Sequence, residues 1–169
     1  MCPELESYLQ MIDDLRGQVR ALVVDLSPAA LNWRPIEGLE EHATNSLAVL
    51  TTHIAGAEHF WIAEVVGLQP PTRDRGAEFV TEAIDAAELV RRLEEVEAET
   101  RQVFAGLEQD DLDGAREARG RTIPVRWCIL HVIDHTALHL GHMQLTYQLW
   151  MGGQTGPSPR WYERIKSKD

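Results

Sequence analysis

Four stretches of this chain carry apolar residues spaced three and four apart, and each stretch is bounded by proline, glycine or helix-capping residues. This spacing is the period of an α-helix, because it places the apolar side chains on one face. Apolar–polar alternation never runs long enough to predict a strand. Four helices of roughly 20 to 25 residues are typical of a bundle. The pattern therefore predicts an all-α, four-helix-bundle fold in a single domain covering residues 1–169.

Each predicted helix has a start and a stop signal of known physical origin. Pro3 suits a first turn, Asn45 or Ser46 can cap the second helix, and Asp85 with Glu88 forms a capping box. Ser27-Pro28 ends the first helix, and Gly152-Gly153 ends the last. The helices are predicted over residues 3–26, 46–66, 85–107 and 124–150. Residues 68–79 cannot form a long helix because of their paired prolines, and residues 109–122 are predicted to be an irregular loop.

The chain is acidic, with 27 aspartates and glutamates against 16 lysines and arginines, a formal net charge of −11. Such a surface repels phosphate backbones and anionic lipid headgroups. Nucleic-acid and membrane partners are therefore not expected. We expect a small-molecule substrate instead. Charge of this kind does not constrain the fold itself.

The two cysteines, Cys2 and Cys128, do not suggest a disulfide framework. The N-terminal segment is acidic and lacks the apolar core of a signal peptide. No apolar run is long enough to span a bilayer. These features predict a soluble protein of the reducing cytoplasm.

The stretch HVIDHTALHLGHM, residues 131–143, holds four of the seven histidines. At about 100° per residue, all four lie on one stripe of a helix that is otherwise largely apolar. Imidazoles on a buried helix destabilise the fold unless they find partners. His135 and His139 are four residues apart, so their rings project side by side in the spacing that chelates zinc on helices. The stretch lacks the glutamate that would follow the first histidine in a zincin, so that class is excluded.

A third ligand is expected from a facing helix, and His53, within LTTHIAGAEHFW, is the best candidate. Gly56 and Ala57 lie three and four residues later on the same side, and we expect them to leave room beside a metal for water or substrate. His59 is about 240° round the helix from His53 and is expected to point elsewhere.

Several neighbouring residues have two possible roles. His131 and His142 could support the ligands or be structural, and Cys128 is expected to pack in the core. Asp134 is poorly placed as a ligand because it lies about 100° from His135. The loop residues Arg73, Arg75 and Glu78, with Arg34, could bind an anionic substrate group or anchor their loops by ion pairs. The helical carboxylate of Glu58 is turned about 140° away from His53, which argues against a non-haem iron site.

The sequence resembles the DinB-like superfamily of metal-dependent enzymes, also called YfiT-like, in the branch related to mycothiol-dependent proteins. The matching features are LNWRP, NSLAVLTTHIAGAEHFWIAEVVG, RDRGAEF and WCILHVIDHTALHLGHMQLTYQLW, which fall in order over residues 25–150. The resemblance implies an up-down-down-up bundle that forms a homodimer. It also implies a divalent metal, zinc or nickel, held by His53, His135 and His139. This branch often carries a basic residue where Tyr147 stands here, which affects the charge on the substrate side.

Members of this superfamily with assigned activities include thiol S-transferases that use bacillithiol or mycothiol, an isomerase and hydrolase-like proteins. Three neutral imidazoles would leave a metal its full charge and an open position, the pattern of a catalytic site. Such a metal could activate a bound water or a low-molecular-weight thiol. Two alternatives remain open: a non-catalytic metal-binding bundle, and a purely structural bundle whose histidines are satisfied by hydrogen bonds.

Overall fold

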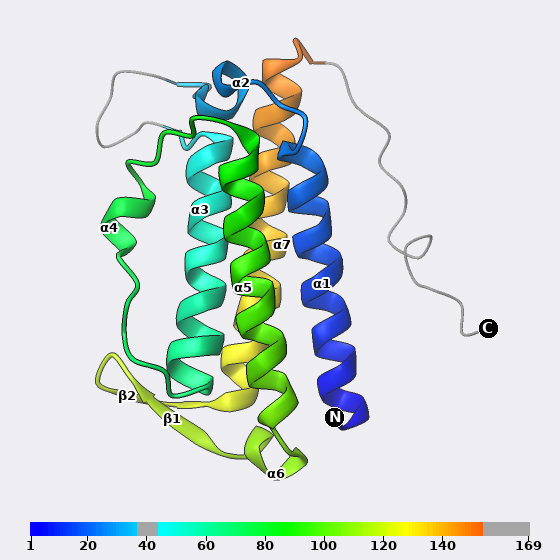
Figure 1. The fold of residues 1–169 in the computed structure, drawn as a ribbon, viewed down its shortest axis with the longest axis vertical. Coiled ribbons are helices and arrows are strands. Elements are labelled where there is room, and N and C mark those ends of the chain that lie inside the picture. Colours follow the sequence, from blue (N-terminus) through cyan, green and yellow to red (C-terminus); the bar gives the residue numbers. More distant parts are fainter. Residues whose placement is uncertain (37–43, 154–169) are drawn as a thin grey trace, which may run out of the picture.

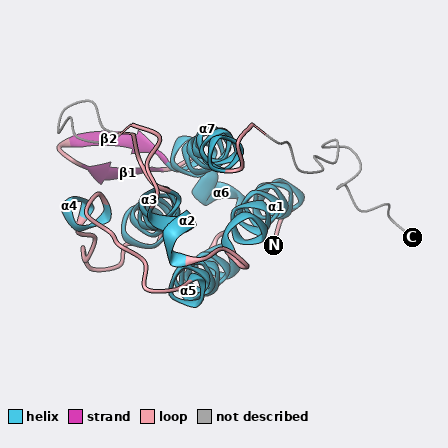
Figure 2. Cartoon of the chain, turned by 90° about the horizontal axis from the view of Figure 1, so that it is seen from above, coloured by secondary structure: helices cyan, strands magenta, loops and turns pink. Residues whose placement is uncertain are grey.

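The computed structural model describes residues 1–36 and 44–153, and most of these residues are helical. The long helices are α1 (Pro3–Val23), α3 (Leu47–Glu58) with its continuation η1 (His59–Val66), α5 (Ala86–Gly106) and α7 (Val125–Trp150). Figure 1 shows α1 rising, α3 and α5 descending and α7 rising again, which is the up-down-down-up order. In the end-on view of Figure 2, α3 lies beside both α5 and α7, and α1 lies across from α3. The predicted four-helix bundle is confirmed.

Ser46 and Asp85, two capping residues predicted from the sequence, cap their helices in the structure. Ser46 accepts a hydrogen bond from the Val49 backbone N–H at 3.2 Å, and Asp85 accepts one from Glu88 N–H at 2.9 Å. These contacts satisfy backbone donors that a helix start leaves without partners. A short helix, α2 (Pro28–Asn32), follows α1.

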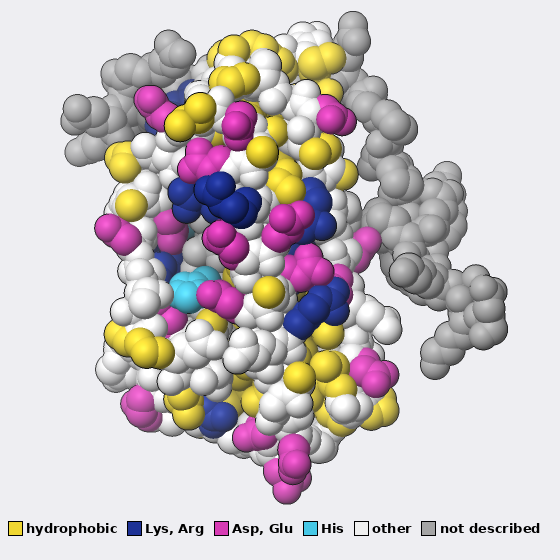
Figure 3. All heavy atoms as spheres, in the orientation of Figure 1, with side chains coloured by type: hydrophobic (Ala, Val, Ile, Leu, Met, Phe, Trp, Pro, Cys, Tyr) yellow, Lys and Arg dark blue, Asp and Glu magenta, His cyan; other side chains and the backbone are white. Residues whose placement is uncertain are grey.

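The two central helices differ in how they are buried. Every residue of α3 except Gly56 is buried. By contrast, α5 buries one apolar stripe and exposes a charged face, where acidic and basic side chains alternate (Figure 3). Glu88 pairs with Arg92 and Glu95 with Arg91 on that face, at the spacing of one helical turn. Buried α3 is thus the helix on which polar side chains need internal partners.

The second predicted helix extends to Val66 as expected, but its C-terminal part is not an α-helix. Residues 59–66 form the π-helix η1, and the N–H of Gly67 bonds the carbonyl of Ile62, five residues back, at 2.8 Å. A π-turn brings residues five apart onto one side, where an α-helix would separate them. His59 and Glu64 accordingly meet, with Nε2 of the ring 3.2 Å from the carboxylate.

The prediction that residues 109–122 are irregular is wrong. They contain α6 (Gln109–Leu112) and an antiparallel hairpin of β1 (Ala115–Ala118) with β2 (Arg121–Pro124). Each strand has four residues, too few for an alternation to stand out in the sequence. The two turn residues, Arg119 and Gly120, both have positive φ, which suits a tight hairpin turn.

Two apolar clusters fill the bundle, one including Phe104 and Ile129, the other Leu50 and Leu89. A buried ion pair accompanies them: Arg16 donates to Glu58 at 2.5 Å. None of the described helices is long and apolar enough to cross a membrane.

Candidate metal centre

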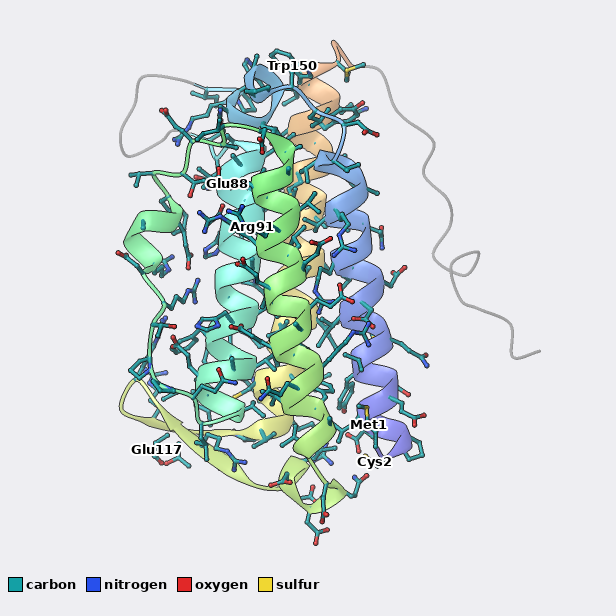
Figure 4. All side chains as sticks on the ribbon, in the orientation of Figure 1. Met1, Cys2, Glu88, Arg91, Glu117 and Trp150 are labelled. Carbon is teal, nitrogen blue, oxygen red and sulfur yellow. The ribbon has the colours of Figure 1, made fainter. Side chains whose placement is uncertain are left out.

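His135 and His139 come from the middle of α7, and His53 comes from the neighbouring α3. Figure 4 places this part of α7 between Trp150 at one end of the bundle and the hairpin of Glu117 at the other. The ring centroids of His53 are 4.9 Å from His135 and 5.0 Å from His139, and the two α7 rings are 4.4 Å apart. One ring nitrogen from each histidine lies within 4.8 Å of the other two. The three residues predicted from sequence are therefore brought together.

The spacing of these nitrogens fits a metal ion. Nε2 of His53 is 3.2 Å from Nε2 of His135. Two imidazoles bound to one tetrahedral zinc at 2.0–2.1 Å place their nitrogens about 3.3 Å apart. The donor set, three imidazoles and no carboxylate, suits zinc, nickel and other transition metals better than magnesium or calcium.

The two α7 histidines are held in their neutral form. Burial, followed by the charges of neighbouring histidines, lowers the pKa of His135 to about 3 and that of His139 to about 4. A neutral imidazole is the form that binds a metal. Near neutral pH both rings therefore offer a lone pair without first losing a proton.

His53 differs from its two partners because its outer nitrogen is engaged. Nδ1 lies 2.7 Å from Oε2 of Glu78, the last residue of α4 (Arg75–Glu78). Arg73 donates to both oxygens of this carboxylate, at 2.6 and 2.9 Å. Burial alone would raise the pKa of Glu78, but the hydrogen bonds from His53 and Arg73 hold that pKa below its ordinary value. Nδ1 of His135 and His139 has no such partner among the described residues.

The space beside Gly56 is occupied, contrary to our expectation that it would be left for water or substrate. A methyl group added at Gly56 would lie 2.2 Å from Oε1 of Glu78 and 2.8 Å from its Cδ. The glycine makes room for a protein carboxylate that contacts His53 rather than for a ligand of the metal.

His59 lies outside the cluster, as its position on the helix predicted. Its Nδ1 is 2.7 Å from Glu99 and its Nε2 is 2.8 Å from the hydroxyl of Thr72. Both ring nitrogens therefore have partners away from the three converging rings. The carboxylate of Glu58 also turns elsewhere, to Arg16 and the hydroxyl of Thr100.

The other two histidines of α7 extend its row of rings. His131 stacks on Trp127, with centroids 4.7 Å apart, and meets the edge of Trp61. Burial lowers the pKa of His131. His142 is exposed and lies 5.4 Å from the His139 ring.

Cys128 is fully buried in the core, and burial raises the pKa of its thiol to about 11, so it does not offer a thiolate to the site. Asp134 is exposed on the outer face of α7. Neither side chain belongs to the group of residues whose donor atoms converge.

The loop arginines make different contacts, and Arg73 makes an ion pair of the loop-anchoring kind considered from sequence. Arg73 anchors its loop through Glu78. Arg75 instead lies over the ring of Phe79, 4.8 Å from its centroid, and that ring is 4.9 Å from His53. Arg34 donates to the backbone carbonyl of Phe79 at 3.5 Å. Sequence reasoning missed Phe79 and the contact of Glu78 with His53; a glycine inside a buried helix, three residues after a histidine, was the available signal.

A cavity of about 340 Å³ lies between α3, α4 and α5, and its lining includes Gly56, Arg73 and Glu78. None of the three clustered histidines lines it. The cavity is therefore bordered by the Glu78 carboxylate, which contacts His53, and not by the three converging rings.

An all-α bundle with three imidazoles converging between two of its helices is the class that fold and site together define. Comparison with known proteins agrees: residues 11–143 match the family model of the DinB superfamily. The chain belongs to the DinB superfamily.

Solved structures show the same fold. A conserved protein from Enterococcus faecalis is 14% identical with a TM-score of 0.69, and the match covers 90% of this chain and 99% of that one. A DinB-like protein from Bacillus cereus is 18% identical, also with a TM-score of 0.69, over 91% of this chain and 97% of its own. No curated protein matches the sequence.

Proposed function

We propose that this protein is a metal-dependent enzyme that binds one divalent ion, zinc or nickel, through His53, His135 and His139. The observation that carries the proposal is the convergence of the three rings, with the nitrogens of His53 and His135 at 3.2 Å, the spacing of two ligands on one ion. A divalent ion bound there would supply a Lewis acid with an open coordination position.

The reaction we propose acts on a small molecule and is a thiol S-transfer, of the mycothiol or bacillithiol type, or a hydrolysis. The chain itself contributes neutral imidazoles and an aromatic border formed by Phe79 and by His131 with its tryptophan partners. Its buried cysteine has a pKa of about 11, so a thiol nucleophile would have to come from a cosubstrate.

The test compares zinc-loaded and nickel-loaded protein with the His139→Ala variant. Each is assayed with an electrophile plus a low-molecular-weight thiol, and separately with ester and amide substrates. Turnover that requires the thiol and is lost in the variant supports S-transfer. Turnover without thiol supports hydrolysis. Stoichiometric metal with no turnover in either panel contradicts the enzyme proposal and favours a non-catalytic metal-binding bundle.

We further propose that the protein is a homodimer of the cytoplasm. α7 leaves a stripe of large apolar side chains exposed along its length, formed by Trp127, Leu130, Leu138, Leu145 and Leu149. An exposed apolar stripe of this length is typical of a surface that binds another chain. The two cysteines are free thiols, which suits a reducing compartment. The mass of the native protein in solution, with and without Leu138→Glu, tests the dimer.

A further inference from the structure

We propose that Glu78, held by Arg73, is the positioning residue for His53: it fixes the tautomer and the ring orientation of one metal ligand. This inference rests on the proposed function, because it assigns a role in metal binding to residues that are not themselves ligands. Carboxylates that bond the outer nitrogen of a ligating histidine orient the ring and strengthen the ligand.

The contacts of the carboxylate determine the tautomer. An ionised carboxylate only accepts hydrogen bonds, so the Nδ1 of His53, 2.7 Å from Oε2 of Glu78, must carry the proton. In the neutral ring the lone pair is then on Nε2, the nitrogen 3.2 Å from Nε2 of His135. His53 needs a proton on Nδ1 and a free Nε2 if it is to bind a metal on the side that faces His135.

Arg73 fixes the carboxylate in turn. Its guanidinium donates to Oε1 at 2.6 Å and to Oε2 at 2.9 Å, a two-point contact that sets the plane of the carboxylate and favours its ionised form. The side chains of both residues are less than 10% exposed, so water competes little for these bonds. The pair therefore presents a fixed acceptor to His53.

Gly56 is the third part of the arrangement. Glycine inside a helix is less favourable than alanine, so a glycine in the middle of a buried helix such as α3 suggests that another group approaches the backbone closely. Here the approaching group is the Glu78 carboxylate, whose Oε1 would be 2.2 Å from an added Cβ. Any side chain at this position would displace the carboxylate from His53.

The loop that carries Arg73 is anchored by the π-helical segment. Glu64 accepts the backbone N–H groups of Thr72 at 2.5 Å and of Arg73 at 2.7 Å. A chain of polar contacts thus runs from Glu64 through Arg73 and Glu78 to His53. Among the described residues, the corresponding nitrogens of the other two ligands have no partner, so this support acts on one ligand of the three.

The experiment measures zinc affinity, by chelator competition, in wild type, Glu78→Gln and Glu99→Gln. Glu99 makes the same contact with the non-ligand His59, at 2.7 Å, and is therefore a matched control. We expect zinc binding to weaken about 10- to 100-fold in Glu78→Gln and to stay within about threefold in Glu99→Gln, because Glu99 contacts a histidine outside the three converging rings. The melting temperature of the metal-free proteins shows whether either variant is simply less folded.

A second variant moves the carboxylate without changing its chemistry. Gly56→Ala should also weaken zinc binding by about tenfold or more. It should also change the cobalt(II) visible spectrum, whereas Glu99→Gln should not. Nitrogen NMR of metal-free wild type should show His53 protonated at Nδ1.

The possible outcomes separate this inference from the proposed function. If wild type binds zinc and Glu78→Gln and Gly56→Ala bind it equally well, the inference is overturned and the proposed function stands. If wild type itself binds no zinc or nickel, the proposed function and the inference are both overturned.

Discussion

His53 and His59, six residues apart on one helical segment, each bond a glutamate through Nδ1 at the same distance of 2.7 Å. They differ in what the other ring nitrogen meets. Nε2 of His53 faces a second imidazole, that of His135, at 3.2 Å. Nε2 of His59 meets a threonine hydroxyl at 2.8 Å and a glutamate at 3.2 Å. A carboxylate partner therefore does not distinguish a candidate ligand from a structural histidine; the surroundings of the second nitrogen do.

The difference follows from local helix geometry. His53 lies in the α-helical part of the segment and points toward α7. His59 opens the π-turn, which aligns it with Glu64 and directs it to the 72–73 loop. The π-turn thereby gives His59 a partner in Glu64. The same glutamate anchors the loop of Arg73, the residue that holds the carboxylate beside His53.

The largest expected effect tests this comparison directly. His53→Ala removes a converging nitrogen and should weaken zinc binding at least about 100-fold, while His59→Ala should leave it within about threefold. Calorimetric titration of the metal-free variants with zinc measures both. Loss of zinc binding in His59→Ala alone would show that the two histidines have been assigned the wrong roles.

A second prediction concerns stability of the metal-free protein against pH. In the fold the pKa values of His135 and His139 are about 3 and about 4, below the value near 6.5 of the unfolded chain. The unfolded state therefore binds more protons below pH 6.5, and the free energy of unfolding should fall as the pH is lowered from about 6.5 toward 4.

The size of this effect is at most about 1.4 kcal/mol per pH unit for each ring, and less because both rings are partly exposed. Urea unfolding at pH 7 and pH 5, in the presence of a chelator, measures it. The His135→Asn/His139→Asn double variant should lose less stability over this interval than wild type, and His59→Gln should behave like wild type. An equal loss in the double variant would contradict the assignment of neutral, partly buried imidazoles to His135 and His139.

The smallest expected effect concerns Glu64, which contacts His59 and holds the loop that carries Arg73. Glu64→Gln removes the charge that holds the backbone N–H groups of Thr72 and Arg73. We expect a loss of about 1 to 2 kcal/mol in stability, toward the lower end of the range for hydrogen bonds to a charged group because glutamine keeps one acceptor oxygen, and a few-fold loss of zinc affinity. Chemical denaturation and chelator competition measure the two quantities. A zinc affinity that falls as far as in Glu78→Gln would mean that the loop, rather than the carboxylate, determines the ligand geometry.

The sequence predicted the candidate ligands because helix periodicity alone fixes relative directions. His135 and His139 had to project side by side, and His59 had to diverge from His53. The bundle followed from the same period together with capping residues that do cap, such as Ser46 and Asp85.

Three features could not be predicted from the local pattern of residues. The π-turn lies in a stretch whose composition suits an ordinary α-helix. The hairpin strands have four residues each, too short to show a period. Glu78 reaches His53 across 25 residues of chain, and only the folded loop shows that it fills the space beside Gly56.

The most direct test of the account is the metal content of the purified, untagged protein beside His139→Ala, after loading with zinc or nickel and removal of unbound ions. The account predicts about one ion per chain in wild type and almost none in the variant. No bound ion in either protein, or an equal amount in both, would contradict it and leave the three converging histidines as structural residues.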